Sequence, residues 1–279
     1  MTRYLRPTDL DEALGALADG PWTILAGGTD HFPARAIRDP DEDILDITAL
    51  PALKGIDRTT QGLRIGAAAT WRAVIDAELP AACAGLKAAA REVGGMQIQN
   101  RGTVGGNLCN ASPAADGVPA LLSLDAEVEI ASAQGSRRLP LDRFVLGNRR
   151  TALAPGELLV AVHLPETALD GAGRFLKLGA RRYLVISIVM VAGTMRLAAD
   201  GTIAAARLAV GACSAAALRL TALEAALAGR TPDEAASVLG GHALDELTPI
   251  ADVRGDAAYR REAARTLLRR CVDDLAAAA

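Results

Sequence analysis

Two glycine-rich segments constrain the fold of this chain more than any other feature. The first, residues 26–30, directly follows an apolar run over 22–26, and the second spans 102–107. Glycine permits positive φ angles and lets the backbone approach an anion, so successive N–H groups can turn toward one point. We therefore expect two loops of exposed backbone N–H groups that hold a diphosphate, and hence a dinucleotide, from two sides. Taken alone, a glycine pair more often makes an ordinary tight turn.

The two segments do not match the common nucleotide-binding fingerprints. Gly105 and Gly106 are adjacent, and no acidic residue follows about 20 residues later on a clear strand, so the G-x-G-x-x-G pattern is absent. A Gly-Lys-Ser or Gly-Lys-Thr sequence is also absent. Neither segment contains lysine or arginine, which favours a stably held diphosphate over a reacting phosphate. Thr103 and Asn107 can donate to phosphate oxygens without adding charge.

Composition excludes several classes of protein. The 279 residues, 51% hydrophobic and 23% charged, are enough for one large domain or two modest ones. The net charge of −3 and the scattered basic residues provide no footprint for nucleic acid. The amino terminus lacks a secretory signal, so we expect a cytoplasmic protein. The longest apolar stretch, 183–193, is about half the roughly 20 residues of a membrane-spanning helix, and we predict a buried strand there.

The cysteines and histidines show no metal-binding pattern. Cys83, Cys109, Cys213 and Cys271 are far apart, with no C-x-x-C pair and no mixed Cys/His cluster, so we expect no metal in this chain. We predict that all four are packed residues, because Cys109, the one candidate redox thiol, has no resolving partner nearby. His163 and His242 are predicted to be structural.

Periodicity predicts a chain that mixes helices and strands and then changes character near residues 168–173. The first part is expected to contain a helix from Thr8 that ends at Gly20, a short helix capped by Thr29 or Asp30 that runs through Ile37, helices at 71–77, 80–93 and 115–123, and strands at 22–26, 44–47, 63–67, 127–131, 137–141 and 158–165. The remainder is expected to form strands at 174–178, 185–197 and 203–211 and then helices at 218–228, 233–239 and 257–276. Strands followed by helices suggest an antiparallel sheet with one face covered by helices.

Two sequence stretches carry a resemblance to a known family. Residues 26–30 read Ala-Gly-Gly-Thr-Asp, and residues 98–116 read Ile-Gln-Asn-Arg-Gly-Thr-Val-Gly-Gly-Asn-Leu-Cys-Asn-Ala-Ser-Pro-Ala-Ala-Asp. They resemble the FAD-binding medium subunit of molybdenum hydroxylases, the xanthine dehydrogenase and carbon monoxide dehydrogenase family. The likeness continues through 157–159 and 175–177 to 181–182 and covers about two thirds of the chain.

The resemblance implies an α+β fold with two domains. The first, residues 1–168, would be an FAD-binding domain of the vanillyl-alcohol-oxidase (PCMH) type, with subdomains over about 1–55 and 56–168. The second, residues 169–279, would be a smaller domain like the carbon monoxide dehydrogenase flavoprotein carboxyl-terminal domain, an antiparallel sheet covered by helices.

The same resemblance implies a set of FAD-binding positions. They are Leu25, Ala26, Gly27, Gly28, Thr29, Asp30, His31, Gly94, Thr103, Val104, Gly105, Gly106, Asn107, Asp116, Leu158, Leu159 and Lys177. The residues from 25 to 31 would wrap the diphosphate and the neighbouring ribose, with the residues of the second loop on the other side.

Four of these positions have a stated role and an ordinary alternative. Asp116 would accept hydrogen bonds from cofactor hydroxyls, or it caps the helix that follows it. Leu158 and Leu159 would pack near the adenine or the flavin ring, or they are strand core. Lys177 would lie close to the isoalloxazine, or it is a solvated strand residue.

The chain departs from the family pattern at two positions. His31 stands where the family usually has an aliphatic residue, and it either donates near the phosphate or points to solvent. After Arg181 and Arg182 the family commonly has an acidic residue, which Val185 replaces here. The resemblance therefore implies that an ion pair or hydrogen bond near the flavin is absent.

The function implied by the resemblance is that of an FAD-carrying electron-transfer subunit. It would pass electrons from [2Fe–2S] clusters of a small partner subunit to NAD, a quinone or oxygen. A large partner subunit would carry molybdopterin, and two three-subunit units would form a dimer. One alternative is a self-sufficient flavoprotein oxidoreductase similar to UDP-N-acetylenolpyruvoylglucosamine reductase. Another is a non-catalytic assembly module.

Overall fold

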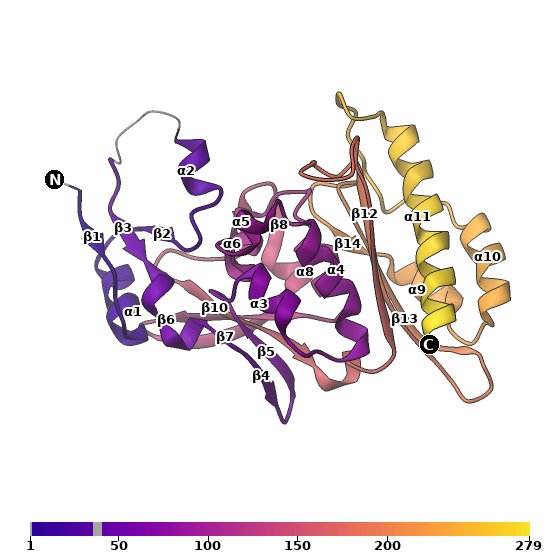
Figure 1. Ribbon diagram of the computed structural model, residues 1–279, viewed down its shortest axis with the longest axis horizontal. Coiled ribbons are helices and arrows are strands. Elements are labelled where there is room, and N and C mark those ends of the chain that lie inside the picture. Colours follow the sequence, from indigo (N-terminus) through magenta and orange to yellow (C-terminus); the bar gives the residue numbers. More distant parts are fainter. Residues whose placement is uncertain (1, 36–40) are drawn as a thin grey trace.

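Three sheets follow one another along the long axis of the molecule, each with its own hydrophobic core (Figure 1). The computed structural model describes residues 2–35 and 41–279. The N-terminal block lies at one end, and the last helices of the chain lie at the other. None of the described helices combines the length and apolar character needed to cross a membrane.

The N-terminal block is a small parallel sheet with two helices. Its strands are β1 (Tyr4–Leu5), β3 (Ile44–Asp46) and β2 (Thr23–Leu25), in that order, with helices α1 (Leu10–Asp19) and α2 (His31–Ala34). Asp9, and not Thr8 as predicted, caps α1, because its carboxylate accepts hydrogen bonds from two N–H groups of the first turn. The predicted short helix after the first glycine loop ends at Ala34, and Ile37 lies outside the described residues.

The middle block is a five-stranded antiparallel sheet with helices on one side. The sheet order is β4 (Ile56–Thr59), β5 (Gly62–Gly66), β10 (Leu158–Pro165), β6 (Glu127–Ser132) and β7 (Gly135–Pro140). The helices are α3 (Trp71–Asp76), α4 (Ala84–Glu92), α5 (Met96–Gln99), α6 (Val104–Asn110), α7 (Gly117–Leu122) and α8 (Leu141–Phe144), and a hairpin follows with β8 (Val145–Gly147) and β9 (Arg150–Thr151). Trp71 and Phe144 are among the largest fully buried side chains of the chain.

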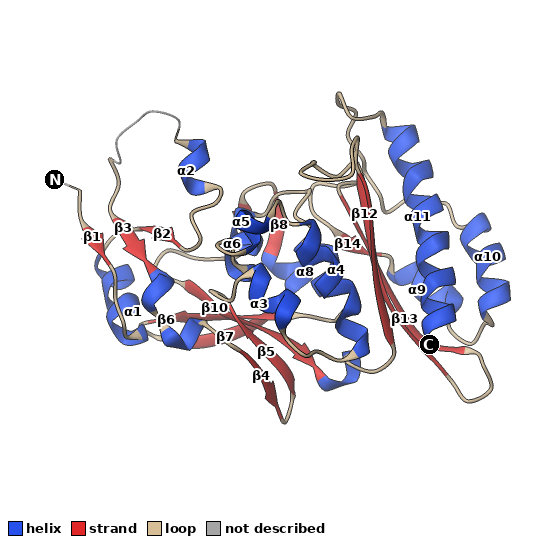
Figure 2. Cartoon of the chain, viewed as in Figure 1, coloured by secondary structure: helices blue, strands red, loops and turns tan. Residues whose placement is uncertain are grey.

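The C-terminal block is an antiparallel sheet covered on both faces. Its strands are β11 (Ala172–Leu178), β12 (Val189–Leu197), β13 (Ile203–Gly211) and β14 (Leu218–Arg219), and its helices are α9 (Thr221–Leu227), α10 (Pro232–Gly241) and α11 (Ala257–Ala278). These helices lie on the outer face (Figure 2), and the inner face packs against α4 and α7 of the middle block. The predicted helix-covered sheet is confirmed, and β12 is buried on both sides for most of its length.

Two predicted elements in this block are wrong in their limits. The apolar stretch 183–193 is not one buried strand, because β12 begins only at Val189. Tyr183, Leu184 and Ile186 lie in the preceding loop and are 67%, 55% and 54% exposed. The helix predicted from Leu218 begins at Thr221, because residues 218–219 form the short strand β14, which pairs with β13.

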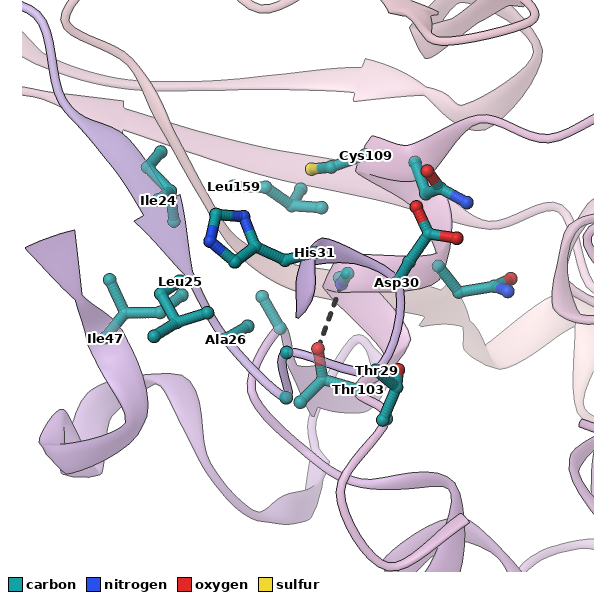
Figure 3. A pocket seen from close by; sticks show the side chains of 18 of the residues that line it. Ile24, Leu25, Ala26, Thr29, Asp30, His31, Ile47, Thr103, Cys109 and Leu159 are labelled. Atoms are coloured by element: carbon teal, nitrogen blue, oxygen red, sulfur yellow. Dashed lines mark hydrogen bonds between the residues drawn. The ribbon is translucent and has the colours of Figure 1, made fainter. Parts of the chain in front are cut away.

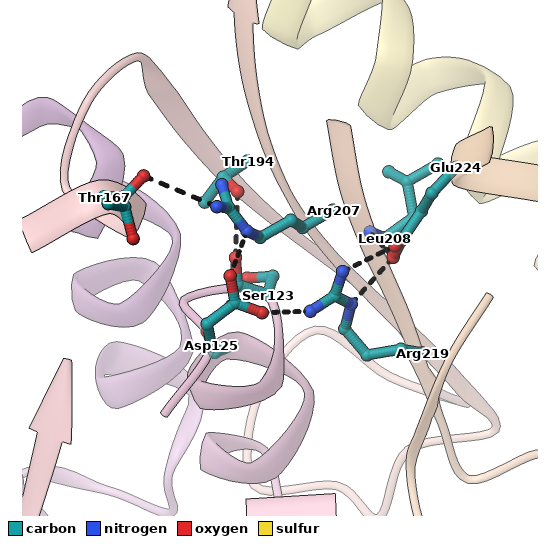
Figure 4. Close-up of polar contacts among 9 residues, drawn as sticks. Ser123, Asp125, Thr167, Thr194, Arg207, Leu208, Arg219 and Glu224 are labelled. Carbon is teal, nitrogen blue, oxygen red and sulfur yellow. Dashed lines mark hydrogen bonds and ion pairs between the residues drawn. The ribbon is translucent and has the colours of Figure 1, made fainter. Parts of the chain in front are cut away.

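A polar network fixes the C-terminal sheet to the middle block (Figure 4). Asp125, which follows α7 and has a φ of 49°, forms ion pairs with Arg207 on β13 and Arg219 on β14. Arg219 also pairs with Glu224, whose Oε1 accepts a hydrogen bond of 2.7 Å from the backbone N–H of Leu208. One carboxylate therefore joins two strands to a helix that lies more than 80 residues earlier in the chain.

Replacing Asp125 with alanine should destabilise the protein. The substitution leaves two half-buried guanidinium groups without their shared carboxylate, and hydrogen bonds to charged groups contribute about 1.5–3 kcal/mol each. Because the site is partly solvated, we expect a loss of about 1–3 kcal/mol in the free energy of unfolding. Urea denaturation measures it, with exposed Asp142→Ala as the control. A loss no larger than that of the control would contradict this role of Asp125.

Candidate functional site

A cavity of about 490 Å³ lies between the N-terminal and middle blocks, at the two glycine loops (Figure 3). Ligand pockets in proteins have volumes of roughly 300–1,000 Å³. The described residues that line it are Ile24, Leu25, Ala26, Gly27, Gly28, Thr29, Asp30, His31, Ile47, Ala67, Trp71, Val93, Ile98, Gly102, Thr103, Gly105, Gly106, Asn107, Cys109, Asn110, Arg149, Leu153, Leu158 and Leu159. The cavity brings both glycine loops into one site, as the sequence predicts.

The first glycine loop presents backbone donors that the described chain does not use. The N–H groups of residues 27–31 make no hydrogen bond to any described residue, and the next N–H group, that of Phe32, donates to the carbonyl oxygen of Gly28. Gly28 has a φ of +72°, a conformation that side chains rarely tolerate. Five consecutive N–H groups without a partner in the described chain are donors available to an anion.

The two loops touch through their backbones. A Cβ atom on Gly27 would overlap the carbonyl oxygen of Arg101, just before the second loop. One on Gly105 would lie 2.7 Å from Ala67, beneath the second loop. Only glycine fits at these two positions, so the glycines serve the close packing of the loops as well as access to a ligand.

The second loop differs from the prediction of free N–H groups. The N–H groups of Val104 and Gly105 donate to the carbonyl oxygens of Ala69 and Ala67, at 2.9 and 2.8 Å. That of Gly106 donates to Oγ1 of Thr103 at 3.0 Å, since Thr103 caps helix α6 (Figure 3). The groups left for a ligand include two side chains: the Thr103 hydroxyl and the Asn107 amide, whose Oδ1 is buried and has no partner among the described residues.

Thirteen of the positions implied by the resemblance line the cavity, and Gly94, Val104, Asp116 and Lys177 do not. Val104 is the fully buried residue within the second loop, and Gly94 lies after α4 with a φ of +58°. Leu158 and Leu159 are buried in the core of β10 and also line the cavity. The two predicted alternatives, strand core and a position beside the cofactor, are therefore compatible.

His31 faces the cavity and not the solvent. Its side chain is 19% exposed, and its Nε2 is buried without a hydrogen-bond partner in the described part of the chain. Burial, followed by the nearby Arg35, lowers the pKa of His31.

Sequence reasoning missed Arg149 and misjudged Cys109. Arg149, in the turn of the β8–β9 hairpin, forms an ion pair of 3.2 Å with Asp30, a residue 119 positions away. No sequence signal links them. Cys109 is exposed on the cavity wall, so its prediction as a packed residue is wrong, whereas Cys83, Cys213 and Cys271 are buried as predicted. Its position on α6, directly after the second loop, was the available clue.

Asp116 and Lys177 form a buried ion pair that joins the middle block to the C-terminal sheet. Nζ of Lys177 lies 2.9 Å from Oδ2 of Asp116, and the hydroxyl of Ser187 donates to Oδ1 at 3.1 Å. The Lys177 side chain is only 7% exposed, so it is not a solvated strand residue. The Asp116 carboxylate accepts no hydrogen bond from the first turn of α7, so the alternative that it caps this helix is wrong. Burial raises the pKa of Asp116 to about 6, although Lys177 acts in the opposite direction.

Comparison with known proteins identifies the family. Residues 1–167 match the model of the FAD binding domain in molybdopterin dehydrogenase, and residues 174–275 match the CO dehydrogenase flavoprotein C-terminal domain. This chain belongs to the FAD-binding subunits of molybdopterin dehydrogenases. The resemblance inferred from the sequence is confirmed.

The relatives of this FAD-binding subunit are similar over their whole lengths. The xanthine dehydrogenase FAD-binding subunit of Escherichia coli O157:H7 is 32% identical over 290 residues, with 99% of this chain and 96% of the relative covered. The glyceraldehyde dehydrogenase medium chain of Sulfolobus acidocaldarius is 30% identical, with 98% of each covered. Among solved structures, carbon monoxide dehydrogenase from Hydrogenophaga pseudoflava that lacks the Mo-pyranopterin moiety matches with a TM-score of 0.86 and 28% identity, over 99% of this chain and 97% of that chain. The predicted α+β fold is thereby confirmed.

The cavity of this subunit fits FAD, the cofactor of the family. The free N–H groups of the first loop suit the diphosphate, and the unpartnered Oδ1 of Asn107 can accept from a hydroxyl group. Ile24, Leu153 and Leu159 supply an apolar wall for a flat ring system. The chemistry of the lining therefore matches both the charged and the apolar parts of the cofactor.

Asp116 should make the stability of the protein fall as the pH rises from about 4 to about 6. The pKa of Asp116 is near 6 in the folded protein and near 3.8 in a free side chain, so the folded state binds this proton more tightly. Ionisation of Asp116 therefore lowers the free energy of unfolding by up to about 3 kcal/mol. The full loss is reached once the pH lies above the pKa of the folded protein. The difference in unfolding free energy between the wild type and Asp116→Asn should decrease over this interval, as measured by urea denaturation.

Asp142→Asn, in the exposed first turn of α8, is the control and should show no such change relative to the wild type. A difference between wild type and Asp116→Asn that stays constant or increases with pH would contradict the raised pKa.

Proposed function

We propose that this chain holds FAD between its two glycine loops and transfers electrons from iron–sulfur clusters of a partner subunit to a terminal acceptor. The observation that carries this proposal is the row of five N–H groups at residues 27–31, which have no partner among the described residues and belong to residues that line a cavity of about 490 Å³. Bound FAD can exchange one or two electrons, while the protein provides orientation and charge. Candidate acceptors are NAD, a quinone and oxygen.

The chain contributes binding and positioning groups. The N–H groups of the first loop hold the diphosphate, and the side chains of Thr103 and Asn107 donate from the opposite side. Gly105 and Gly106 keep this side open, and Val104 anchors it in the core. His31 lies within the same wall as a further polar group.

We propose that Lys177 lies at the flavin end of the site. Asp116 neutralises and fixes this ammonium group, because the two side chains form a buried ion pair. Gly94 allows the chain to turn after α4, beside residues Val93 and Ile98 of the cavity wall. Leu158 and Leu159 pack against the adenine or the flavin ring.

We further propose the subunits with which this chain assembles. The relative from Sulfolobus acidocaldarius is called a medium chain, which implies smaller and larger partners in that enzyme. By analogy, a small subunit with [2Fe–2S] clusters would donate electrons to this chain, and a large subunit would carry molybdopterin. Two such three-subunit units would form the dimer.

The domain division is also a proposal. A boundary between residues 168 and 169 places the N-terminal and middle blocks in one FAD-binding domain, with its subdomain limit near residue 55. It is supported by the short connection between β10, which ends at Pro165, and β11, which begins at Ala172.

Replacing Gly106 with aspartate should weaken FAD binding and leave the fold intact. Gly106 is exposed at the cavity, and a Cβ there would lie 2.8 Å from Oγ1 of Thr103, so this hydroxyl group has to shift slightly. Like charges about 4 Å apart near a protein surface repel by up to about 4 kcal/mol, so FAD affinity should fall at least about tenfold. Fluorescence titration of the apoprotein with FAD measures the affinity.

Gly241→Asp, at the end of α10 where an added Cβ meets nothing within 4 Å, is the matched control and should bind FAD normally. Unchanged affinity in Gly106→Asp would contradict the assignment of the loop. A folded wild-type chain that neither retains nor rebinds FAD would contradict the proposed function.

A further inference from the structure

A second cavity, of about 550 Å³, lies between α4, β11 and α11, and six of the fourteen described residues that line it are basic. Its basic lining residues are Arg91, Arg174, Arg181, Arg182, Arg270 and Lys177. Glu92 is the one acidic residue among the described residues that line it. This concentration of positive charge contrasts with the net charge of −3 of the whole chain.

Only part of this positive charge is neutralised. Lys177 pairs with Asp116, and Arg174 pairs with Asp274 at 2.8 Å. Arg91 and Arg270 are exposed and form no ion pair with the described residues. The cavity therefore keeps a positive surplus.

The loop between β11 and β12 holds two more arginines that form no ion pair with the described residues. The guanidinium group of Arg181 donates to the carbonyl oxygen of Leu184, and that of Arg182 lies 5.3 Å from the ring centre of Tyr183. Neither contact supplies negative charge to offset the guanidinium, so both arginines add to the surplus.

The construction of this cavity favours a charged protein surface over a tightly held phosphate. Helix α4 contributes Arg91 and Glu92 from its last turn, where the helix dipole is negative, and α11 contributes Leu267 and Arg270 from its middle. Phosphate sites usually use helix N-termini or glycine-rich loops, which present backbone N–H groups. Here the attraction to an anion comes from arginine side chains on three separate elements.

The rim of the cavity has the composition of a protein interface. Tyr183, Leu184 and Ile186 are exposed, and their loop lines the cavity through Arg181, Arg182 and Val185. Arginine and aromatic residues are enriched in protein–protein interfaces and at their energetic centres. A partner with acidic residues around a small apolar contact would match both features.

We propose that this arginine-lined cavity and the loop at 181–186 dock an acidic one-electron carrier protein, the terminal acceptor of the chain. This inference rests on the proposed function, which places Lys177 of the cavity wall at the flavin end of the FAD site. Two oxidised carriers each accept one electron from one reduced FAD, and the protons of the reduced FAD pass to water. Charge steers the encounter, so the rate should depend steeply on salt.

Cytochrome c provides a matched pair of probes, because succinylation converts its basic lysines to acidic groups and leaves the haem in place. The FAD-loaded chain is reduced anaerobically and mixed in a stopped-flow instrument with either oxidised form. At about 10 mM ionic strength the succinylated form should be reduced at least about tenfold faster than the native form. This advantage should disappear near 150 mM, where the Debye length is about 8 Å.

The double substitution Arg91→Glu/Arg270→Glu should remove the preference and slow reduction of the succinylated form at least about tenfold. Arg143→Glu/Arg230→Glu makes the same charge change outside the cavity lining and should keep the preference. A preference unchanged by the Arg91/Arg270 substitutions, or a faster reaction with native cytochrome, would overturn the proposal. Loss of NAD reduction without loss of cytochrome reduction in the cavity variant would assign the cavity to a nucleotide and also overturn it.

The FAD content of each protein, measured first by visible absorbance, separates this inference from the proposed function. A wild-type chain without FAD contradicts both. A fully loaded chain whose reaction with the two cytochromes shows no charge preference contradicts only the docking proposal.

Discussion

The backbone contact between the two glycine loops is the constraint on which the candidate cofactor site depends. Gly27 lies against the carbonyl oxygen of Arg101 so closely that a methyl group cannot enter, and a Cβ on Gly105 would lie 2.7 Å from Ala67. This contact joins the small N-terminal sheet to the middle block and fixes the width of the cavity between them. The first loop can then leave its N–H groups free, because its position is secured from outside the loop and needs no hydrogen bonds of its own.

Elements with a clear pattern and clear ends could be predicted from the sequence. The limits of β10 and β13 agree with their predicted limits, because an alternating or apolar run ends at proline or glycine in each case. The stretch at 183–193 was harder, since an apolar run does not reveal whether its side chains are covered. Its first half is exposed in a loop, and only the part from Ser187 onward is buried.

The cavity itself was predictable in part. The local sequence reveals glycines and the neighbouring hydroxyl and amide groups, and these do line it. The local sequence does not reveal that the N–H groups of Val104 and Gly105 donate to the carbonyl oxygens of Ala69 and Ala67. Those acceptors lie on a segment more than 30 residues away. Arg149 was not predicted as a site residue for the same reason, because its contact with Asp30 depends on how a distant hairpin packs against the loop.

The C-terminal sheet has apolar residues on both faces, with its own helices on one side and α4 and α7 on the other. If the helices on either face moved away from this sheet, a broad apolar surface would become exposed to water. The C-terminal block is therefore fixed against the middle block, and it does not move Lys177 toward or away from the rest of the chain. A molecule that approaches Lys177 from the side of the second cavity therefore meets a wall of fixed shape, and opening and closing steps of the kind that many oxidoreductases use would not come from this sheet.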